Sequence, residues 1–209
     1  MFNVCPVCGT YSVEKEVRQH LGWQAFAVCP GCGYAHPFLR LPLLVVTGAS
    51  ATGKTALALA LSASDTRFIH LESDILWRSE FNTPETDYRE YRELWLRLAK
   101  NIGQAGRPVI LYGSVIPGQF SACLERRYFS QVHTLALVCE ENILVERLRL
   151  RPAWRNAGSE IFIQSMLEFN RWFIEHASAE MAVLDTGRAS LAETAEEILR
   201  WAAGYWNTL

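Results

Sequence analysis

One stretch of eight residues restricts the fold of this chain more than any other. It fits the pattern G-x-x-x-x-G-K-[ST] at every fixed position and consists of Gly48, Ala49, Ser50, Ala51, Thr52, Gly53, Lys54 and Thr55. The apolar run 43–47 before it is typical of a buried parallel strand, and the run 56–61 after it favours helix. A strand, a glycine loop and a helix in this order predict a loop that binds phosphate groups through backbone N–H groups.

The residue types within this loop indicate which phosphate compound it binds. Gly48 and Gly53 allow the backbone to turn sharply and to approach a phosphate closely. Lys54 can reach the β- and γ-phosphates of a nucleoside triphosphate, and the Thr55 hydroxyl can hold Mg²⁺. We therefore expect all eight residues to bind the nucleotide and Lys54 also to take part in catalysis. The loop does not identify a second substrate.

Four of the six cysteines form two C-P-x-C-G repeats, with Cys5 and Cys8 in the first and Cys29 and Cys32 in the second. The spacing is that of a Zn²⁺ site, in which two thiolates from each repeat meet one tetrahedral ion. Two disulfides or a redox pair are the alternatives. A cytosolic chain disfavours the first, and the duplication of the motif disfavours the second. We expect residues 1–40 to form a zinc ribbon that the metal stabilises.

Length and charge limit the classes of partner. The 209 residues suit one domain plus a small module, and the net charge of -2 gives no bulk attraction to nucleic acid or anionic membranes. We see no membrane span and no signal peptide, and expect a cytoplasmic protein without a membrane partner. The oligomeric state is not predicted. Four aromatic residues of the ribbon could stack bases or pack against the larger domain: Trp23, Phe26, Tyr34 and Phe38.

Strand and helix patterns alternate from residue 43 onward and predict a parallel sheet. Strands are expected at 43–47, 67–71, 109–112, 132–139 and 181–184. Helices are expected from Lys54, from Asp87 and over about 142–150, 159–177 and 190–201. Asp87-x-x-Glu90 and Ser190-x-x-Glu193 resemble capping boxes. Residues 41–209 are thus predicted to form a three-layer α/β/α domain around a five-stranded parallel sheet.

Acidic residues follow the second expected strand, at the sheet edge where α/β proteins bind ligands. One carboxylate of the pair Glu72 and Asp74 can take a proton from an acceptor hydroxyl or hold it in line, while its neighbour helps to organise Mg²⁺. We expect Asp74 to be catalytic, and the sequence does not decide which of the two organises Mg²⁺. The alternative is that Ser73 or Asp74 caps a helix. The third expected strand ends without a carboxylate, so Mg²⁺ would depend on Thr55, water and the Glu72/Asp74 pair.

Four arginines lie within nine residues after the fourth expected strand. Arg147 and Arg151 are four residues apart on an expected helix, so one helix edge could present both guanidinium groups to a moving phosphoryl group. Arg149 is expected to face solvent, and Arg155 lies in a loop that ends with glycine. The alternative for the whole cluster is a solvated surface paired with nearby glutamates.

The order of these segments resembles the P-loop NTPases that phosphorylate small molecules, including shikimate, gluconate, adenylylsulfate and nucleoside or nucleotide kinases. The resemblance covers residues 43 to about 202. It implies an acceptor pocket after the second strand and an arginine-bearing lid after the fourth. Asp185-Thr186-Gly187-Arg188 resembles the adenine-side loop of gluconate-type kinases, which implies ATP as the nucleotide and Arg188 as one of its contacts.

Together these features predict an ATP-dependent phosphotransferase. It would move the γ-phosphoryl group to a small-molecule acceptor, such as a nucleoside, a nucleotide or a sugar, with the help of Mg²⁺ and with Zn²⁺ in the ribbon. Two alternatives stay open: a P-loop enzyme that acts on RNA through its ribbon, and a non-catalytic nucleotide sensor whose ribbon recruits a protein. The start of the domain also resembles tRNA prenyl transferases, a family of longer chains.

Overall fold

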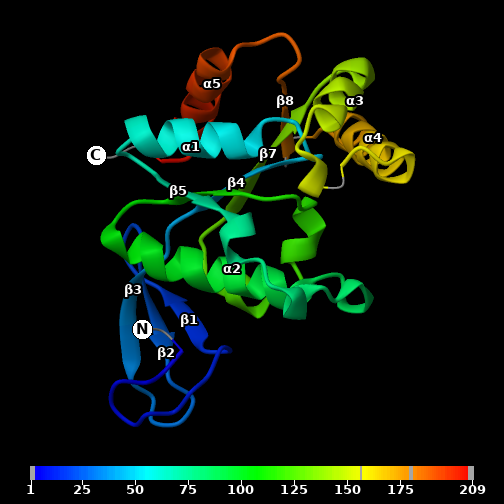
Figure 1. Cartoon of the computed structure of the whole chain (residues 1–209). Coiled ribbons are helices and arrows are strands. Elements are labelled where there is room, and N and C mark those ends of the chain that lie inside the picture. The colour runs from blue at the N-terminus through cyan, green and yellow to red at the C-terminus, as the bar shows by residue number, and fades with distance from the viewer. Residues whose placement is uncertain (1–2, 156, 179–180, 207–209) are drawn as a thin grey trace.

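The computed structural model describes residues 3–155, 157–178 and 181–206 and contains two separate sheets (Figure 1). The small sheet is antiparallel with strand order β1-β2-β3: β1 Glu16–Gln19, β2 Gln24–Val28 and β3 Ala35–Leu39. The large sheet is parallel with strand order β5-β6-β4-β7-β8: β4 Leu43–Gly48, β5 Ile69–Glu72, β6 Val109–Tyr112, β7 Val132–Val138 and β8 Met181–Asp185. The predicted five-stranded parallel sheet is therefore confirmed.

Helices cover both faces of the parallel sheet, which makes the expected three layers. Their bounds are α1 Lys54–Ser64, α2 Arg89–Ile102, α3 Glu141–Arg149, α4 Glu160–Glu175 and α5 Leu191–Ala203. Side chains of α1 and α5 share one apolar cluster with β4, while α2 and α4 pack on the opposite face (Figure 1). All six residues of β4 are buried, because a central parallel strand is covered on both sides.

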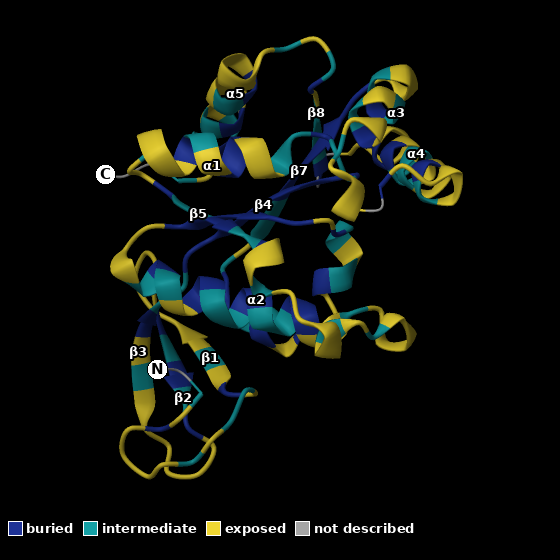
Figure 2. Ribbon diagram, viewed as in Figure 1, coloured by how far each residue is buried: buried dark blue, intermediate teal, exposed yellow. Residues whose placement is uncertain are grey.

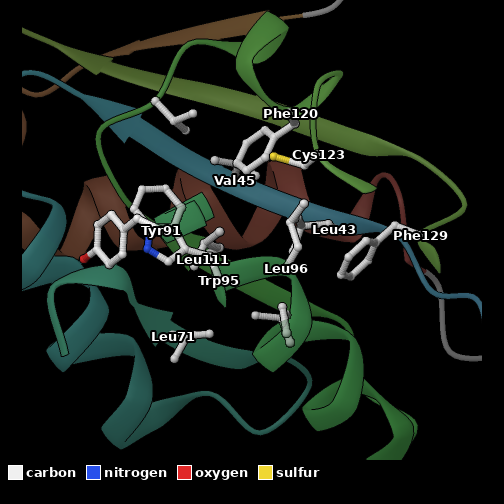
Figure 3. Packing of buried hydrophobic residues seen from close by; sticks show 13 residues of the cluster. Leu43, Val45, Leu71, Tyr91, Trp95, Leu96, Leu111, Phe120, Cys123 and Phe129 are labelled. Carbon is white, nitrogen blue, oxygen red and sulfur yellow. The ribbon is translucent and has the colours of Figure 1, made fainter. Parts of the chain in front are cut away.

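Helix α2 is anchored on the sheet by aromatic and aliphatic side chains. Tyr91, Trp95 and Leu96 face Leu43 and Val45 of β4 in one contiguous cluster (Figure 3). The period of these positions is that of an α-helix with one apolar face. The same face reaches the end of the sheet at which β4 and β5 finish, so α2 can supply side chains to that edge.

The ribbon lies beyond α2, on the side of that helix away from the sheet, and most of its surface is exposed (Figure 2). Of the four aromatic residues singled out above, two pack against the larger domain. Trp23 lies 5.3 Å from Trp206 and Phe38 lies 5.9 Å from Tyr128, measured between ring centroids. The other two contact histidines of the ribbon itself, Phe26 in a tilted arrangement with His20 and Tyr34 edge-on to His36. Packing on the larger domain is thus confirmed for Trp23 and Phe38.

One expected helix start is wrong. Asp87 does not cap α2, which begins at Arg89 without a side-chain cap, and Asp87 has a left-handed backbone with φ 52°. Its carboxylate accepts hydrogen bonds from the side chains of Arg92, within α2, and of the distant Gln119 instead, and these partners outcompete the backbone at the helix start. The second predicted box forms, with Ser190 and Glu193 bonding reciprocally at the start of α5. No helix in the described ranges is both long and apolar enough to span a membrane.

Candidate active site

The loop between β4 and α1 has the backbone that its glycines predict. Gly48 has φ +141°, and a Cβ there would lie 2.4 Å from the carbonyl oxygen of Leu137. Gly53 has φ +106° and precedes α1 without a side-chain cap. Because no side chain caps this helix, its first N–H groups are available to an anion in front of the loop.

Lys54 folds back over the loop. Its Nζ donates hydrogen bonds to the carbonyl oxygens of Gly48 at 2.7 Å and of Ala49 at 2.9 Å. Burial lowers the pKa of the Lys54 ammonium to about 8, although Asp74 and Glu72 oppose this shift. The ammonium therefore lies at the centre of the loop, where it would meet phosphate oxygens.

The two acidic residues at the end of β5 have different partners. The Thr55 hydroxyl donates a hydrogen bond to the carboxylate of Glu72. Asp74 lies within the 3₁₀ helix Ser73–Leu76, makes no capping hydrogen bond and forms an ion pair with Arg155 at 3.9 Å. The helix-cap alternative for Asp74 and Ser73 is thus excluded by the geometry. No carboxylate follows β6, where Tyr112 is succeeded by Gly113 and Ser114.

The two predicted lid arginines are close to the loop but do not share a helix edge. Helix α3 ends at Arg149, so Arg151 lies in the turn beyond it, ahead of Pro152. Arg147 donates to the hydroxyl of Thr186 at 3.2 Å and to its carbonyl oxygen at 2.8 Å. The Thr186 hydroxyl in turn bonds the Thr52 carbonyl at 3.1 Å, which ties the arginine to the phosphate loop.

Two further arginines lie outside this arrangement. Arg149 is exposed and forms an ion pair with Glu160 at 2.9 Å, as expected of a solvated position. Arg188 is also exposed and pairs with Glu140 at 2.6 Å. Arg188 does not line the cavity described next, so its role as a nucleotide contact stays a prediction.

A cavity of about 450 Å³ lies at the carboxyl edge of the parallel sheet and collects most of the predicted site residues. The residues that line it are Ser50, Ala51, Gly53, Lys54, Thr55, Ala56, Glu72, Ser73, Asp74, Trp77, Tyr88, Tyr91, Arg92, Trp95, Tyr112, Gly113, Ser114, Arg147 and Arg151. The loop forms one end, and the acidic pair and the lid arginines lie around it. A single cavity thus combines a phosphate loop with carboxylates and guanidinium groups.

Sequence reasoning missed the far wall of this cavity, which is built from α2 and the segments before it. Tyr88, Tyr91, Arg92 and Trp95 recur at helical spacing and line the cavity, together with Trp77. Arg92 is buried, and its Nη2 bonds the carboxylate of Asp87 at 2.9 Å. Within the described chain, Nε of Arg92 has no hydrogen-bond partner. The sequence signal that could have revealed this wall is an arginine among aromatic residues at helical spacing.

The end of β6 must stay small to keep this wall in place. A Cβ on Gly113 would lie 2.8 Å from Oγ of Ser73 and 3.1 Å from the ring of Trp95. Ser114 donates to the carbonyl oxygen of Gly48 at 3.0 Å. The backbone after β6 therefore packs directly between the phosphate loop and the aromatic wall.

The four ribbon cysteines form a second candidate site. Their Sγ atoms all lie within 4.8 Å of one another, with 3.7 Å between Cys5 and Cys32 and 3.6 Å between Cys8 and Cys29. Sulfurs around a tetrahedral Zn²⁺ at ≈ 2.3 Å are separated by ~3.8 Å, so the cluster fits this ion. The Thr10 hydroxyl, 3.2 Å from Sγ of Cys8, is the largest influence that lowers the pKa of this thiol to about 6.

Comparison with solved structures identifies the fold. A sugar kinase from Janibacter sp. HTCC2649 matches with a TM-score of 0.56 and 19% identity over 79% of this chain and 94% of that one. A gluconokinase from Sinorhizobium meliloti 1021 matches at 0.53 and 21% over 79% and 93%, and a putative kinase from Chloroflexus aurantiacus at 0.54 and 18% over 80% and 98%. The larger domain therefore has the P-loop kinase fold. No protein-family model and no curated protein matches the chain.

Proposed function

We propose that this protein is an ATP-dependent kinase of a small hydroxyl-bearing molecule. The observation that carries the proposal is the single cavity in which Lys54, Thr55, Asp74 and Arg151 meet at the edge of the parallel sheet. Phosphoryl transfer depends mainly on positioning and on charge stabilisation, and these groups supply both. The structural likeness to sugar and gluconate kinases supports the same class of reaction.

The loop end of the cavity would hold the nucleotide. Backbone N–H groups of residues 48–55 and the ammonium of Lys54 would bind the β- and γ-phosphates. Thr55 and Glu72, which already touch each other, are oxygen ligands of the kind that Mg²⁺ prefers. When bound there, Mg²⁺ would neutralise phosphate charge. The base of ATP would lie toward the loop at Thr186, on the side of Arg188.

The wall from α2 would hold the acceptor. Trp77, Tyr91 and Trp95 provide faces for a ring, and the buried guanidinium of Arg92 has an Nε donor without a partner in the described chain. Asp74 would accept the proton of the acceptor hydroxyl while the hydroxyl oxygen of the acceptor bonds to the γ-phosphorus and ADP leaves. Ring-bearing polar acceptors, namely nucleosides, nucleotides and sugars, fit these groups.

Guanidinium groups would stabilise the charge of the moving phosphoryl group. Arg151 lines the cavity, and burial lowers its pKa, with Arg155 adding to this shift. Arg155 forms an ion pair with Asp74, so the lid segment already bridges to the acceptor side. Arg147 would hold the loop at Thr186 while it adds positive charge behind the phosphates.

The ribbon would carry one Zn²⁺ bound by Cys5, Cys8, Cys29 and Cys32. The tetrahedral spacing of the four sulfurs supports this assignment. The ion would hold the two knuckles together and take no part in phosphoryl transfer. We place the border between the ribbon, residues 1–40, and the kinase domain, residues 41–209, just before β4, and we propose a cytoplasmic location.

A screen of nucleosides, nucleotides and sugars with ATP and Mg²⁺, followed by mass spectrometry of the products, tests the proposal. With the acceptor found, Asp74→Asn should lower kcat by ~10²–10⁴-fold and leave ATP affinity measured by calorimetry unchanged. Arg151→Ala should lower kcat, while Arg149→Ala, its exposed neighbour, is the matched control. An Asp74→Asn enzyme with the original rate would remove Asp74 from the mechanism.

Two other results of the screen would replace the proposal. Tight ATP binding without turnover on any acceptor would identify a nucleotide sensor. Transfer only in the presence of RNA would favour the RNA-directed alternative, for which a salt-dependent gel shift is the direct check.

A further inference from the structure

A pair of opposite charges is buried beneath the ribbon. The side chains of Lys100, on α2, and Glu125, in the 3₁₀ helix Leu124–Tyr128, are each 1% exposed and form an ion pair. A buried ion pair loses hydration on both sides, so it persists only where further partners satisfy the remaining atoms. The identity of these partners therefore shows what the pair holds together.

The partners come from three separate parts of the chain. Glu125 also accepts hydrogen bonds from Nε of Arg97 at 2.9 Å and from Nδ2 of Asn3 at 3.0 Å. Lys100 donates to Oδ1 of Asn3 at 2.8 Å and lies 4.1 Å from the ring centroid of Tyr128. Asn3 belongs to the ribbon and stands two residues before the first zinc knuckle. One carboxylate thus joins the ribbon to two turns of α2.

A second set of hydrogen bonds joins the ribbon to the C-terminal end of the same helix. Gln104, directly after α2, accepts from the backbone N–H of Leu39 at 2.8 Å and donates to the Leu39 carbonyl at 3.0 Å. The hydroxyl of Tyr128 donates to the Val13 carbonyl at 2.8 Å. Contacts at both ends of the ribbon therefore converge on the C-terminal half of α2 and on the segment packed against it.

Helix α2 is the element that carries the acceptor wall. Tyr91, Arg92 and Trp95 line the cavity, and Arg97 and Lys100 follow on the next turn and a half of the same helix. Residues 48–55 make no hydrogen bond or ion pair to the ribbon anywhere in the described part of the chain. The ribbon can therefore act on the acceptor side of the cavity without touching the nucleotide side.

We propose that the zinc ribbon sets the position of α2 through Glu125, so that Glu125 and Asn3 are positioning residues for the acceptor. This proposal rests on the proposed kinase function for its kinetic consequence but not for its structural one. Loss of zinc would release Asn3 and the ribbon, loosen α2 and weaken acceptor binding, while the phosphate loop keeps its shape and its affinity for ATP.

Asn3→Ala is the first test, because it removes two hydrogen bonds from the ribbon side and leaves the buried ion pair intact. Glu125→Gln is the stronger variant, and Glu14→Gln, an exposed ribbon carboxylate paired with Arg127, is the matched control. Hydrogen exchange of α2 amides in the zinc-loaded full chain gives a readout that needs no acceptor. We expect faster exchange in α2 for both test variants, and unchanged exchange in α1 and β4.

The kinetic readout separates positioning from general loss of stability. A coupling of ordinary size would raise the acceptor KM by about 5–150-fold and leave the KM for ATP unchanged. Removal of zinc by a chelator should give the same pattern. The proposal would be overturned if α2 exchange and the acceptor KM were the same as in the unchanged, zinc-loaded protein for Asn3→Ala, for Glu125→Gln and after chelation. Faster α2 exchange without any kinase activity would uphold the coupling and reject the proposed function instead.

Discussion

The ribbon and the parallel sheet are held together by different forces. Within the described residues up to 40, few side chains are buried: Cys5, Lys15, Ala25, Ala27, Cys29 and Phe38. In the larger half, helices cover both faces of the sheet and three apolar clusters surround β4 and β7. Burial of apolar surface stabilises the sheet by ~25 cal/mol per Å², whereas a module as small as the ribbon would rely on the proposed Zn²⁺.

This difference shows that the ribbon depends on the rest of the chain. Its small core of Ala25, Ala27 and Phe38 is closed by Tyr128, which comes from the larger half. One end of the ribbon would thus be held by the proposed Zn²⁺ between its four cysteines, and the other is closed by Tyr128 of the larger half. The two candidate sites therefore rest on separable interactions, and each can be removed while the other is observed.

The largest expected effect follows from removal of one zinc ligand. Cys29→Ser should abolish zinc binding and unfold the ribbon, because apparent Zn²⁺ binding energies of ≈ 10–16 kcal/mol are folding energy in such modules. Hydrogen exchange should become fast in β1 to β3 and stay slow in β4 and β6. Cys123→Ala, which removes a buried thiol of the larger half, is the matched control and should retain zinc. A ribbon whose amides still exchange slowly without metal would contradict the idea that zinc stabilises its fold.

Lys54→Ala should affect catalysis in the larger half and leave the ribbon unchanged. The loss of one charge that stabilises the transferred phosphoryl group typically lowers kcat by ~10²–10³-fold. The zinc content and the thermal midpoint should stay as in the unchanged chain, since the hydrogen bonds of the Lys54 side chain within the described residues go to loop carbonyls. Steady-state kinetics and metal analysis are the measurements. Retained turnover in a folded variant would show that this loop is not the catalytic phosphate site.

Tyr128→Phe sharpens the comparison at the border of the two halves. The change removes the hydroxyl that donates to the Val13 carbonyl and accepts from the Lys15 N–H at 3.3 Å. Leaving buried polar groups unpaired costs about 1–3 kcal/mol. Local opening of the ribbon, measured by hydrogen exchange with zinc bound, should increase accordingly. Tyr11→Phe, at an exposed ribbon position, is the control and should change nothing.

The smallest effect is a pH dependence of ATP binding. Burial lowers the pKa of Lys54 to about 8 in the free protein, and bound phosphates would raise it. Affinity is then constant below pH 8 and falls as the pH rises further, by at most about tenfold per pH unit. Calorimetry in two buffers should show proton uptake near pH 8. Lys54→Arg should be flat over this range, and a flat profile of the unchanged protein would contradict the prediction.

Local patterns predicted most of the fold. The strand expected at 109–112 is β6 without change, and Ser190 and Glu193 form the capping box that their spacing indicates. The capping box at Asp87 was wrong, because the carboxylate of Asp87 binds Arg92, one turn into α2, and Gln119, a distant partner, instead of the backbone at the start of the helix. Local signals thus succeed where neighbouring residues decide the conformation and fail where tertiary contacts compete.

The same distinction between local patterns and tertiary contacts applies to the candidate site. The loop residues and the acidic pair were found from their spacing, and the structure brings the pair and five of the eight loop residues into one cavity, while Gly48, Ala49 and Thr52 do not line it. Arg147 and Arg151 were expected on one helix edge, but α3 ends at Arg149 and the two reach the cavity from different segments. Tyr91 and Trp95 of α2 are both core residues and part of the cavity wall, a double role that helical spacing alone does not reveal.

The sequence alone determined the phosphate loop and the two cysteine knuckles, since each depends on backbone conformations within a few consecutive residues. Only the tertiary structure decided that Glu72 reaches Thr55, that α2 supplies one wall of the cavity, and that Asn3 meets Glu125 across 122 positions of the chain. Contacts between distant residues depend on how complete helices pack on the sheet, and no short pattern specifies that packing.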